Sequence, residues 1–345
     1  FTAISLASTF FVAVNYVAQA GWSVSIKRIP EAMGGYLKFG MTFMILIFIF
    51  GHHDIYHWTH AHLYDKSSEH YDKILDGKRG FLNIPFYSVR LALYTIIWVG
   101  FTHLFRKQSL LEDANGGLDH YKRSFTYGAI FVVLFGVTSS TSAWDILMSI
   151  DAHWFSTLFG WYIFAGMFVS FFAMMCLFIV YLKSRNYMGH VNENHMHDVG
   201  KFMFAFSVFW TYLWFSQFML IWYANLPEEV VYYKVRWENY KTLWAGNFLI
   251  NFIAPFLVLM TRDAKRKLQI LTVGGIIILI GHWIDVYVMV MPGIIGTNKY
   301  PGFIEIGTAM FFLGAFLLVT YKELTKAALV PKNHPMLQES LHHHI

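Results

Sequence analysis

Residues 144–164 read WDILMSIDAHWFSTLFGWYIF, and they join two long apolar segments with almost no linker between them. The joint holds Asp145, Asp151 and His153, but no Lys or Arg. Just upstream, residues 138–142 are five hydroxyl residues in a row inside an otherwise apolar segment. Between membrane-spanning helices, acids beside a hydroxyl-lined helix are costly and mark a candidate functional site.

The composition indicates that this stretch belongs to a membrane protein. Of the 345 residues, 56% are hydrophobic and only 14% are charged, whereas soluble domains carry about 25% charged residues. The single cysteine, Cys176, excludes intramolecular disulfides, Cys-ligated iron–sulfur clusters and a CxxCH haem attachment within the chain. The net charge of +5 does not indicate nucleic-acid binding, because the basic residues lie in short loops between apolar segments.

Nine apolar segments are each near the roughly 20 residues that a helix needs to cross a bilayer. They are residues 1–20, 34–51, 84–105, 124–143, 155–182, 199–223, 242–261, 268–291 and 303–321. We therefore predict an all-α polytopic membrane protein with one integral domain over residues 1–330 and a polar surface tail over 331–345. Because Phe1 falls inside an apolar run, we expect the full protein to begin earlier, with a tenth helix.

The distribution of Lys and Arg predicts the orientation. Seventeen of these residues lie on the side reached after the first segment and nine on the other side. The richer side, which includes the C-terminus, is predicted to be cytoplasmic. The loops 52–83, 224–241 and 292–302 and the joint 145–153 are then predicted to lie outside.

The segment 268–291 contains the main candidate for chemistry. His282 and Asp285 are three residues apart, so they can pair on one helix face. Both lie more than a turn from either end of the segment, where a charged side chain costs about 2.5–3.5 kcal/mol. The alternative is a purely structural role, in which the pair forms hydrogen bonds between helices. We favour that structural role for Asn247 and Asn251. Pro255 is expected to kink their segment.

The joint offers a second candidate, provided that one helix runs through it. A single face would then carry Ser142, Asp145, Ser149 and His153. That spacing suits a proton path with bound water. The alternative is helix capping, with Asp151 or Ser156 capping the following segment.

The third candidate is the histidine-rich run HHDIYHWTHAH at residues 52–62. If it is helical, His53 and His57 share a face, and so do Asp54 and His57. Such a set can bind a metal, and it also resembles a run of haem ligands. No second His set faces it from within another segment. We therefore predict no metal or haem in this chain. A partner-docking surface or a proton relay are the other interpretations. Glu228, in the loop 224–241, could accept protons or simply face water.

Several long motifs resemble one protein family. The motifs are QAGWS (19–23), RIPEA (28–32), SIDAHWFST (149–157), WFSQFMLIWYANLPE (214–228) and GHWID (281–285). They resemble a large membrane subunit of bacterial alternative complex III, most closely the ActF-type subunit, a relative of the NrfD/PsrC membrane anchors. The paralogous ActC-type subunit is the nearest alternative.

That resemblance implies two four-helix bundles with flanking helices, here near residues 34–182 and 199–321. It implies a complex of the bacterial inner membrane that oxidises menaquinol or ubiquinol. Electrons would pass through an iron–sulfur subunit and multihaem and monohaem cytochrome c subunits. A sister NrfD-like subunit is expected to bind quinol, whereas the ActF-type subunit is expected to lack redox cofactors and is linked to proton translocation. Further implied partners are small membrane subunits, lipids and a terminal oxidase.

Three functions are compatible with these observations, and the weakest is a stand-alone secondary transporter, because the sequence shows no inverted repeat that would support it. The first is a non-catalytic, cofactor-free subunit that provides scaffold and a proton path. The candidate residues for that path are His282, Asp285, Asp145, Asp151, His153, Glu228, Asp54 and His57. The alternative is a catalytic quinol-binding anchor, which predicts an aromatic-lined pocket near the outer surface with a His or Asp within reach of the quinone.

Overall fold

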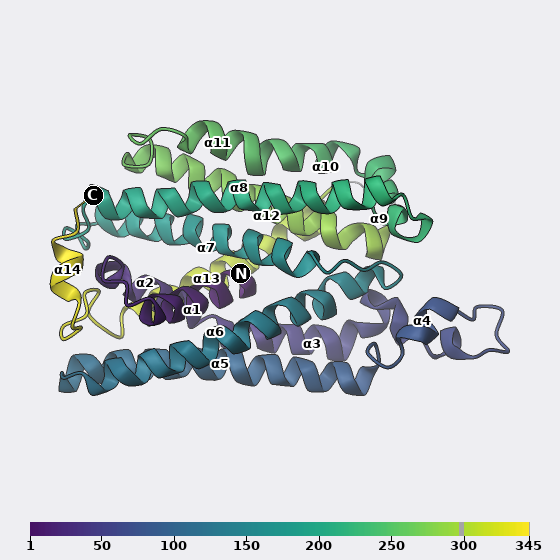
Figure 1. Cartoon of the computed structure of the whole chain (residues 1–345), viewed down its shortest axis with the longest axis horizontal. Coiled ribbons are helices and arrows are strands. Elements are labelled where there is room, and N and C mark those ends of the chain that lie inside the picture. The colour runs from purple at the N-terminus through teal and green to yellow at the C-terminus, as the bar shows by residue number, and fades with distance from the viewer. Residues whose placement is uncertain (297–299, 345) are drawn as a thin grey trace.

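The computed structural model describes residues 1–296 and 300–344, and all regular elements within them are helical, which confirms the all-α polytopic fold (Figure 1). The helices are α1 (Thr2–Val17), α2 (Arg28–Gly34), α3 (Leu37–Ile55), α4 (Lys73–Lys78), α5 (Ile84–Asn115), α6 (Asp119–Ile146), α7 (Phe159–Ser184), α8 (Glu193–Ala224), α9 (Pro227–Asn239), α10 (Lys241–Phe248), α11 (Ala254–Leu259), α12 (Leu268–Ile295), α13 (Phe303–Leu324) and α14 (Leu337–Leu341). Short 3₁₀ turns lie at η1 (Val24–Ile26), η2 (His57–Thr59), η3 (Ala61–Tyr64) and η4 (Met148–Asp151), and η5 (Leu249–Ile253) is a π-helix.

Eight helical stretches of the described residues are long and apolar enough to cross a membrane. They are α2 with α3, α5, α6, α7, α8, α10 through α11, α12 and α13. The first of the nine predicted spans differs, because α1 has only 16 residues and ends at Val17. The chain leaves α1 through Gln19, whose φ of 50° is left-handed and cannot continue a right-handed helix.

The helices form two groups (Figure 1). The first contains α1, α2, α3, α5 and α6, and the second contains α7, α8, α10, α11 and α12, with α13 packed on α2. Helix α7 packs on α8 and α12, and also on α1 and α6. The first bundle predicted from the sequence, residues 34–182, includes α7. In the structure, α7 packs against both groups.

Helix α7 is the central helix of the molecule. Within its most apolar window 78% of the residues are buried, against 11% for α13. A helix that is apolar on all sides must be surrounded either by protein or by lipid, and this difference assigns α7 to the protein interior. The stretch 144–164 therefore connects α6 to the helix on which both groups pack.

The bundle has two ends. The C-terminal end is where α5, α7 and α11 finish, where α6, α8 and α12 begin, and where α14 lies, at the left of Figure 1. The α9 end is opposite and carries α4 and α9. The tail 331–344 packs against the C-terminal end rather than projecting as a solvated segment, because Ser340 is fully buried and donates to the carbonyl of Trp22 at 2.8 Å.

Candidate functional site

Asp285 lies in the second group, surrounded by neutral hydrogen-bond donors from three helices. Oδ1 accepts from the Tyr162 hydroxyl of α7 and from Asn247 Nδ2 of α10, the latter at 2.7 Å. Oδ2 accepts from Trp210 Nε1 of α8 at 3.1 Å. Asp285 is 3% exposed, so its carboxylate is stabilised by hydrogen bonds rather than by water.

His282 completes this centre. Among the described side chains that contact Asp285, it is the one that can become a cation. Its Nδ1 lies 3.8 Å from Asp285 Oδ2, one turn along α12, as the spacing predicts. Its Nε2 is buried and has no hydrogen-bond partner within the described chain. The ring packs against Gly166, where a Cβ would lie only 3.4 Å from Nδ1.

The backbone of α10 to α11 is shaped to reach this centre. Pro255 lacks an N–H and cannot donate to the carbonyl four residues earlier, and the helix adopts a π turn, η5, just before it. This distortion positions Asn251, which donates to Asn247, and leaves its own Oδ1 buried without a partner among the described residues. The close approach of α12 to η5 requires a glycine at position 281, because a Cβ on Gly281 would lie 2.3 Å from Asn251 Oδ1.

Hydroxyl and amide groups lie between Asp285 and the α9 end. Asp285 is ten residues from the end of α12, or about 15 Å along the helix. Tyr162 packs in one cluster with Tyr232 and Tyr233 of α9. Burial raises the pKa of Tyr232 to about 12, so its hydroxyl keeps its proton at neutral pH. Gln217, which is itself buried, donates to the Tyr233 hydroxyl at 3.0 Å.

Asp145 lies in the first group and has a different environment. Arg90 of α5 donates to it through two nitrogens, each at 2.7 Å, and the Tyr94 hydroxyl donates at 2.7 Å. The guanidinium also lies 3.9 Å from the ring centroid of Phe81. Asp145 is thus neutralised by a bidentate ion pair with strong geometry, and its arrangement is that of a structural contact.

Asp151 pairs with Arg236 of α9, whose guanidinium is 2.9 Å from Oδ2. Arg236 also donates to the backbone carbonyls of Val288 and Met289 in α12. Pro292 explains this contact, because it cannot donate to the carbonyl of Val288 four residues earlier. Asp151 and Arg236 therefore stabilise the irregular end of α12 against the joint.

The predicted polar face through the joint does not form. Helix α6 ends at Ile146 and η4 follows, so Asp145, Ser149 and His153 do not share a helix face. His153 instead contacts Asp72 at the surface, with its side chain 51% exposed. The capping alternative is also wrong, since the residue before α7 is Leu158 and no side chain caps that helix. The physical reason is that α6 ends two residues before the 3₁₀ turn, which changes the direction of every later side chain.

The histidine-rich run also departs from its predicted geometry. Helix α3 ends at Ile55 and His57 lies in η2, so His57 does not share a helical face with His53 or Asp54. Burial, followed by the charge of nearby His60, lowers the pKa of His57. Among the described residues no group of three or more His, Cys, Asp or Glu side chains is placed to hold a metal ion. Asp54 and Glu228 are both exposed at the surface of the chain.

The sequence-based reasoning missed a buried ionic cluster at the C-terminal end. Glu31, whose side chain is 1% exposed, accepts from Arg28 and Arg106 at 2.8 Å each. Lys27 donates to the Tyr16 hydroxyl at 2.6 Å and lies 3.4 Å from Glu112. Burial alone would lower the pKa of Lys27, but Tyr16, Glu31 and Glu112 together raise it. The i, i+3 spacing of Arg28 and Glu31 was the available signal.

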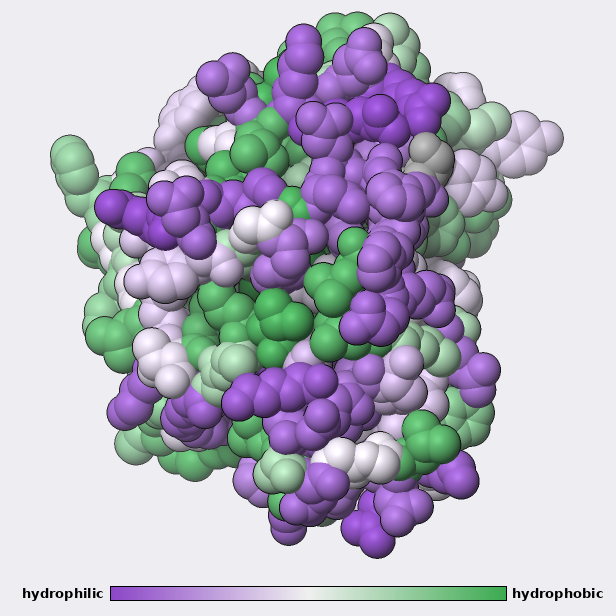
Figure 2. All heavy atoms as spheres, turned by 90° about the vertical axis from the view of Figure 1, so that its left-hand side faces the viewer, coloured by the Kyte–Doolittle hydropathy of each residue, from purple (hydrophilic) through white to green (hydrophobic). Residues whose placement is uncertain are grey.

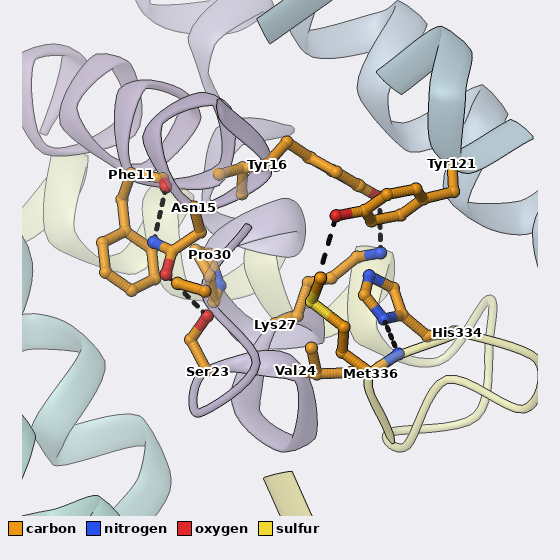
Figure 3. Close-up of a pocket in the computed structure, with 12 residues that line it drawn as sticks. Phe11, Asn15, Tyr16, Ser23, Val24, Lys27, Pro30, Tyr121, His334 and Met336 are labelled. Atoms are coloured by element: carbon orange, nitrogen blue, oxygen red, sulfur yellow. Dashed lines mark hydrogen bonds between the residues drawn. The ribbon is translucent and has the colours of Figure 1, made fainter. Parts of the chain in front are cut away.

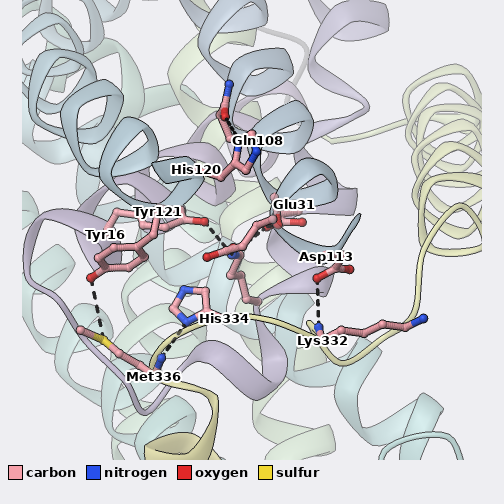
Figure 4. Close-up of polar contacts among 12 residues, drawn as sticks. Tyr16, Glu31, Gln108, Asp113, His120, Tyr121, Lys332, His334 and Met336 are labelled. Atoms are coloured by element: carbon pink, nitrogen blue, oxygen red, sulfur yellow. Dashed lines mark hydrogen bonds and ion pairs between the residues drawn. The ribbon is translucent and has the colours of Figure 1, made fainter. Parts of the chain in front are cut away.

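The tail closes a pocket beside this cluster. The pocket has an empty volume of about 340 Å³ and is lined by Tyr16, Lys27 and His334 among others (Figure 3). The backbone N–H of Lys332 donates to Asp113 at 3.0 Å, and His334 Nδ1 accepts from the N–H of Met336 (Figure 4). This pocket lies at the C-terminal end rather than near the α9 end, so it does not favour the quinol-binding alternative, which predicts a pocket near the outer surface.

Comparison with known proteins adds no family assignment, since the chain matches no family model and no curated protein. The function must therefore be argued from the site itself. Of the predicted site residues, the structure brings together only His282 and Asp285 as a buried pair. Tyr162 and Trp210, which bind Asp285, carried no sequence signal because aromatic residues are abundant in every apolar segment.

Proposed function

We propose that this chain is a cofactor-free integral subunit of a membrane complex that oxidises quinol and passes electrons to a cytochrome c-type acceptor. Its own contributions would be scaffold and a proton path centred on Asp285 and His282. The observation that carries the proposal is a buried carboxylate that has only neutral donors and one imidazole around it. A membrane protein retains such a group at considerable cost, which is why intramembrane acids mark proton relays.

The chemistry follows from charge balance at the pair. With His282 neutral, Asp285 leaves a net negative charge in the apolar bundle. A proton added to the unpartnered Nε2 makes His282 cationic, and the pair as a whole becomes neutral. The imidazole Nδ1, already 3.8 Å from Oδ2, can then donate toward the carboxylate after a small rotation. The pair can thus take up one proton and release it again.

The class of complex rests on the motifs that resemble the alternative complex III subunit. Two of these motifs coincide with the joint at η4 and with the Asp285 centre. We propose the bacterial inner membrane as the location, with the C-terminus in the cytoplasm, in agreement with the excess of Lys and Arg at that end. The proposed partners are a sister NrfD-like quinol-binding subunit, an iron–sulfur subunit, cytochrome c subunits and small membrane subunits.

The test is purification of the tagged chain from its native membrane in a mild detergent. We expect c-type haem absorbance, iron–sulfur subunits and quinol oxidation to co-purify with it. The assembly is then reconstituted in vesicles with a pH-sensitive dye, and Asp285→Asn is compared with the unaltered protein. We expect proton translocation per electron to fall with Asp285→Asn while quinol oxidation persists.

Asp151→Asn is the matched control, because it changes an acid that pairs with Arg236 instead of lying among neutral donors. Equal proton translocation in Asp285→Asn and the unaltered protein would exclude Asp285 from the path. Purification of the chain alone, without haem or quinol oxidation, would contradict the assignment to this complex class.

A further inference from the structure

A second polar region lies at the C-terminal end of the second group, where α8 begins and α11 turns into α12. The two elements pack closely, since a Cβ on Gly200 of α8 would lie 2.9 Å from Cβ of Lys265. Figure 2 looks onto this end of the molecule, and hydrophilic side chains cover much of its upper part, on the side of α8, α11 and α12, as well as much of its lower half. This region is separate from both Asp285 and the tail pocket.

Positive charge is in excess there. The cations are Lys201, Arg262, Lys265, Arg266 and Lys267, and the acids are Glu193, Asp198 and Asp263. Two of the cations are already engaged: Lys201 pairs with Asp198, which also contacts His343, and Lys265 donates to three carbonyls at the end of α11. Arg262, Arg266 and Lys267 have no ion pair among the described residues.

Two buried groups in this region lack partners among the described residues. Arg266 donates through one terminal nitrogen to Asn194 at 3.2 Å, while its Nε is buried and unpaired. His197, one turn along α8 from Asn194, is 7% exposed and its Nδ1 is also unpaired. His197 lies close enough to Arg266 and Lys201 to interact with both electrostatically. Both groups therefore lie where the first turns of α8 pack against the turn that leads into α12.

Helix α12 adds its N-terminus to the same region. The residue before it is Lys267, no side chain caps the helix, and its first turn contains no acid. The free N–H groups and the helix dipole favour an anion at this place. Beside it, α11 and α12 expose apolar side chains, with Leu257 63%, Met260 52% and Val273 51% exposed. An apolar surface next to an anion site is what a phospholipid requires.

We propose that His197, Arg266 and the N-terminus of α12 bind the phosphate group of an anionic phospholipid at the membrane surface. The phosphate would accept from Arg266 and from the first N–H groups of α12, with His197 as a further donor. The acyl chains would lie along the exposed apolar side chains of α11 and α12. Anionic lipids of the same leaflet are attracted by juxtamembrane Lys and Arg, and a free phosphate would leave the apolar surface unused.

The experiment uses the full chain, purified in a neutral detergent and titrated with phosphatidylglycerol, phosphatidylcholine or inorganic phosphate. Binding is followed by native mass spectrometry and by the midpoint of thermal unfolding. We expect phosphatidylglycerol to bind more tightly than phosphatidylcholine, and Arg266→Gln to weaken its binding about fivefold, as the loss of one cation at a membrane surface implies.

Two further variants keep the proposal testable if Arg266→Gln folds poorly. Lys267→Gln changes an exposed residue of the same region, and Lys107→Gln changes an exposed cation of α5 at the same end of the bundle. Weaker phosphatidylglycerol binding in Lys267→Gln but not in Lys107→Gln supports the site. Equal weakening in both would show a diffuse charge effect and overturn the proposal, as would saturation of the site by inorganic phosphate or no preference for phosphatidylglycerol.

Discussion

Asp145 and Asp285 are both buried acids near the α9 half of the bundle, yet their surroundings differ in one respect. Asp145 is held by the guanidinium of Arg90 through two hydrogen bonds. Asp285 is held by a hydroxyl, an indole and an amide, and its nearest ionisable neighbour is His282. The first acid has a permanent counter-charge, whereas the second has one that depends on a proton.

This difference separates a structural acid from a candidate proton carrier. An arginine keeps its charge at every accessible pH, so the Arg90–Asp145 pair has no reason to exchange protons. A histidine side chain can be neutral or cationic, so the counter-charge that His282 offers to Asp285 is not permanent. Burial alone would not have distinguished them, because Asp145 is 1% and Asp285 is 3% exposed.

Asp145→Asn should have the largest effect on stability. It leaves Arg90 buried with no counter-charge, and breaking a buried ion pair costs about 3–5 kcal/mol. The free energy of unfolding, measured by denaturant titration in mixed micelles, should fall by that amount. Adding Arg90→Met should restore part of the loss. An Asp145→Asn protein no less stable than Asp285→Asn would contradict the distinction.

Asp285→Asn should cost less stability, about 1–3 kcal/mol, because the amide keeps one acceptor and no buried cation loses its partner. The same denaturant titration measures this change. Tyr162→Phe removes one donor to Asp285 and should cost about 1 kcal/mol, which makes it a matched control. A loss as large as that of Asp145→Asn would mean that Asp285 also balances a permanent charge.

His334 extends the comparison to a buried base. Burial, followed by the charge of Lys27, lowers the pKa of His334 to about 3, so it is neutral when the tail is docked. Tail docking is then fully stable above about pH 6.5 and weakens as pH falls below that value. Between pH 7.5 and 5.5 the docking equilibrium should shift about tenfold, or about 1.4 kcal/mol. Limited proteolysis of the tail measures this docking equilibrium. His334→Gln should remove its pH dependence. A pH dependence that persists in this variant would show that another group is responsible.

The surface pair of His153 and Asp72 contains the same residue types as His282 and Asp285, but it is exposed. His153→Ala should therefore change stability by less than about 1 kcal/mol. Lys78, which donates to the carbonyl of Ala152 at 2.6 Å, holds the same loop to the joint independently. Thermal unfolding of His153→Ala measures the effect. A larger loss of stability would show that this exposed contact stabilises the protein more than a surface ion pair does.

Much of the fold could be predicted from the sequence, because long apolar segments must be helical in a membrane. The exception was α1, where a 20-residue apolar run gives a 16-residue helix followed by a turn at Gln19. The His282–Asp285 pair was also predictable, since both residues lie on one helix and their spacing alone determines their distance.

Contacts between distant segments could not be predicted in the same way. The joint at 145–153 contains no Lys or Arg, yet Arg90, Arg236 and Lys78 all reach it from other elements. Arg90 could have been suspected, because an arginine inside a predicted span requires a partner. The end of α6 at Ile146 had no comparable signal, and that single boundary decided the position of His153.

The most direct test of the difference between the two acids is pH-difference infrared spectroscopy of the purified full chain. We predict a coupled imidazole and carboxylate signal that titrates in the unaltered protein, disappears in both His282→Gln and Asp285→Asn, and persists in Asp151→Asn. Spectra of His282→Gln and Asp285→Asn that match the unaltered protein would contradict the assignment of a proton-exchanging pair at Asp285.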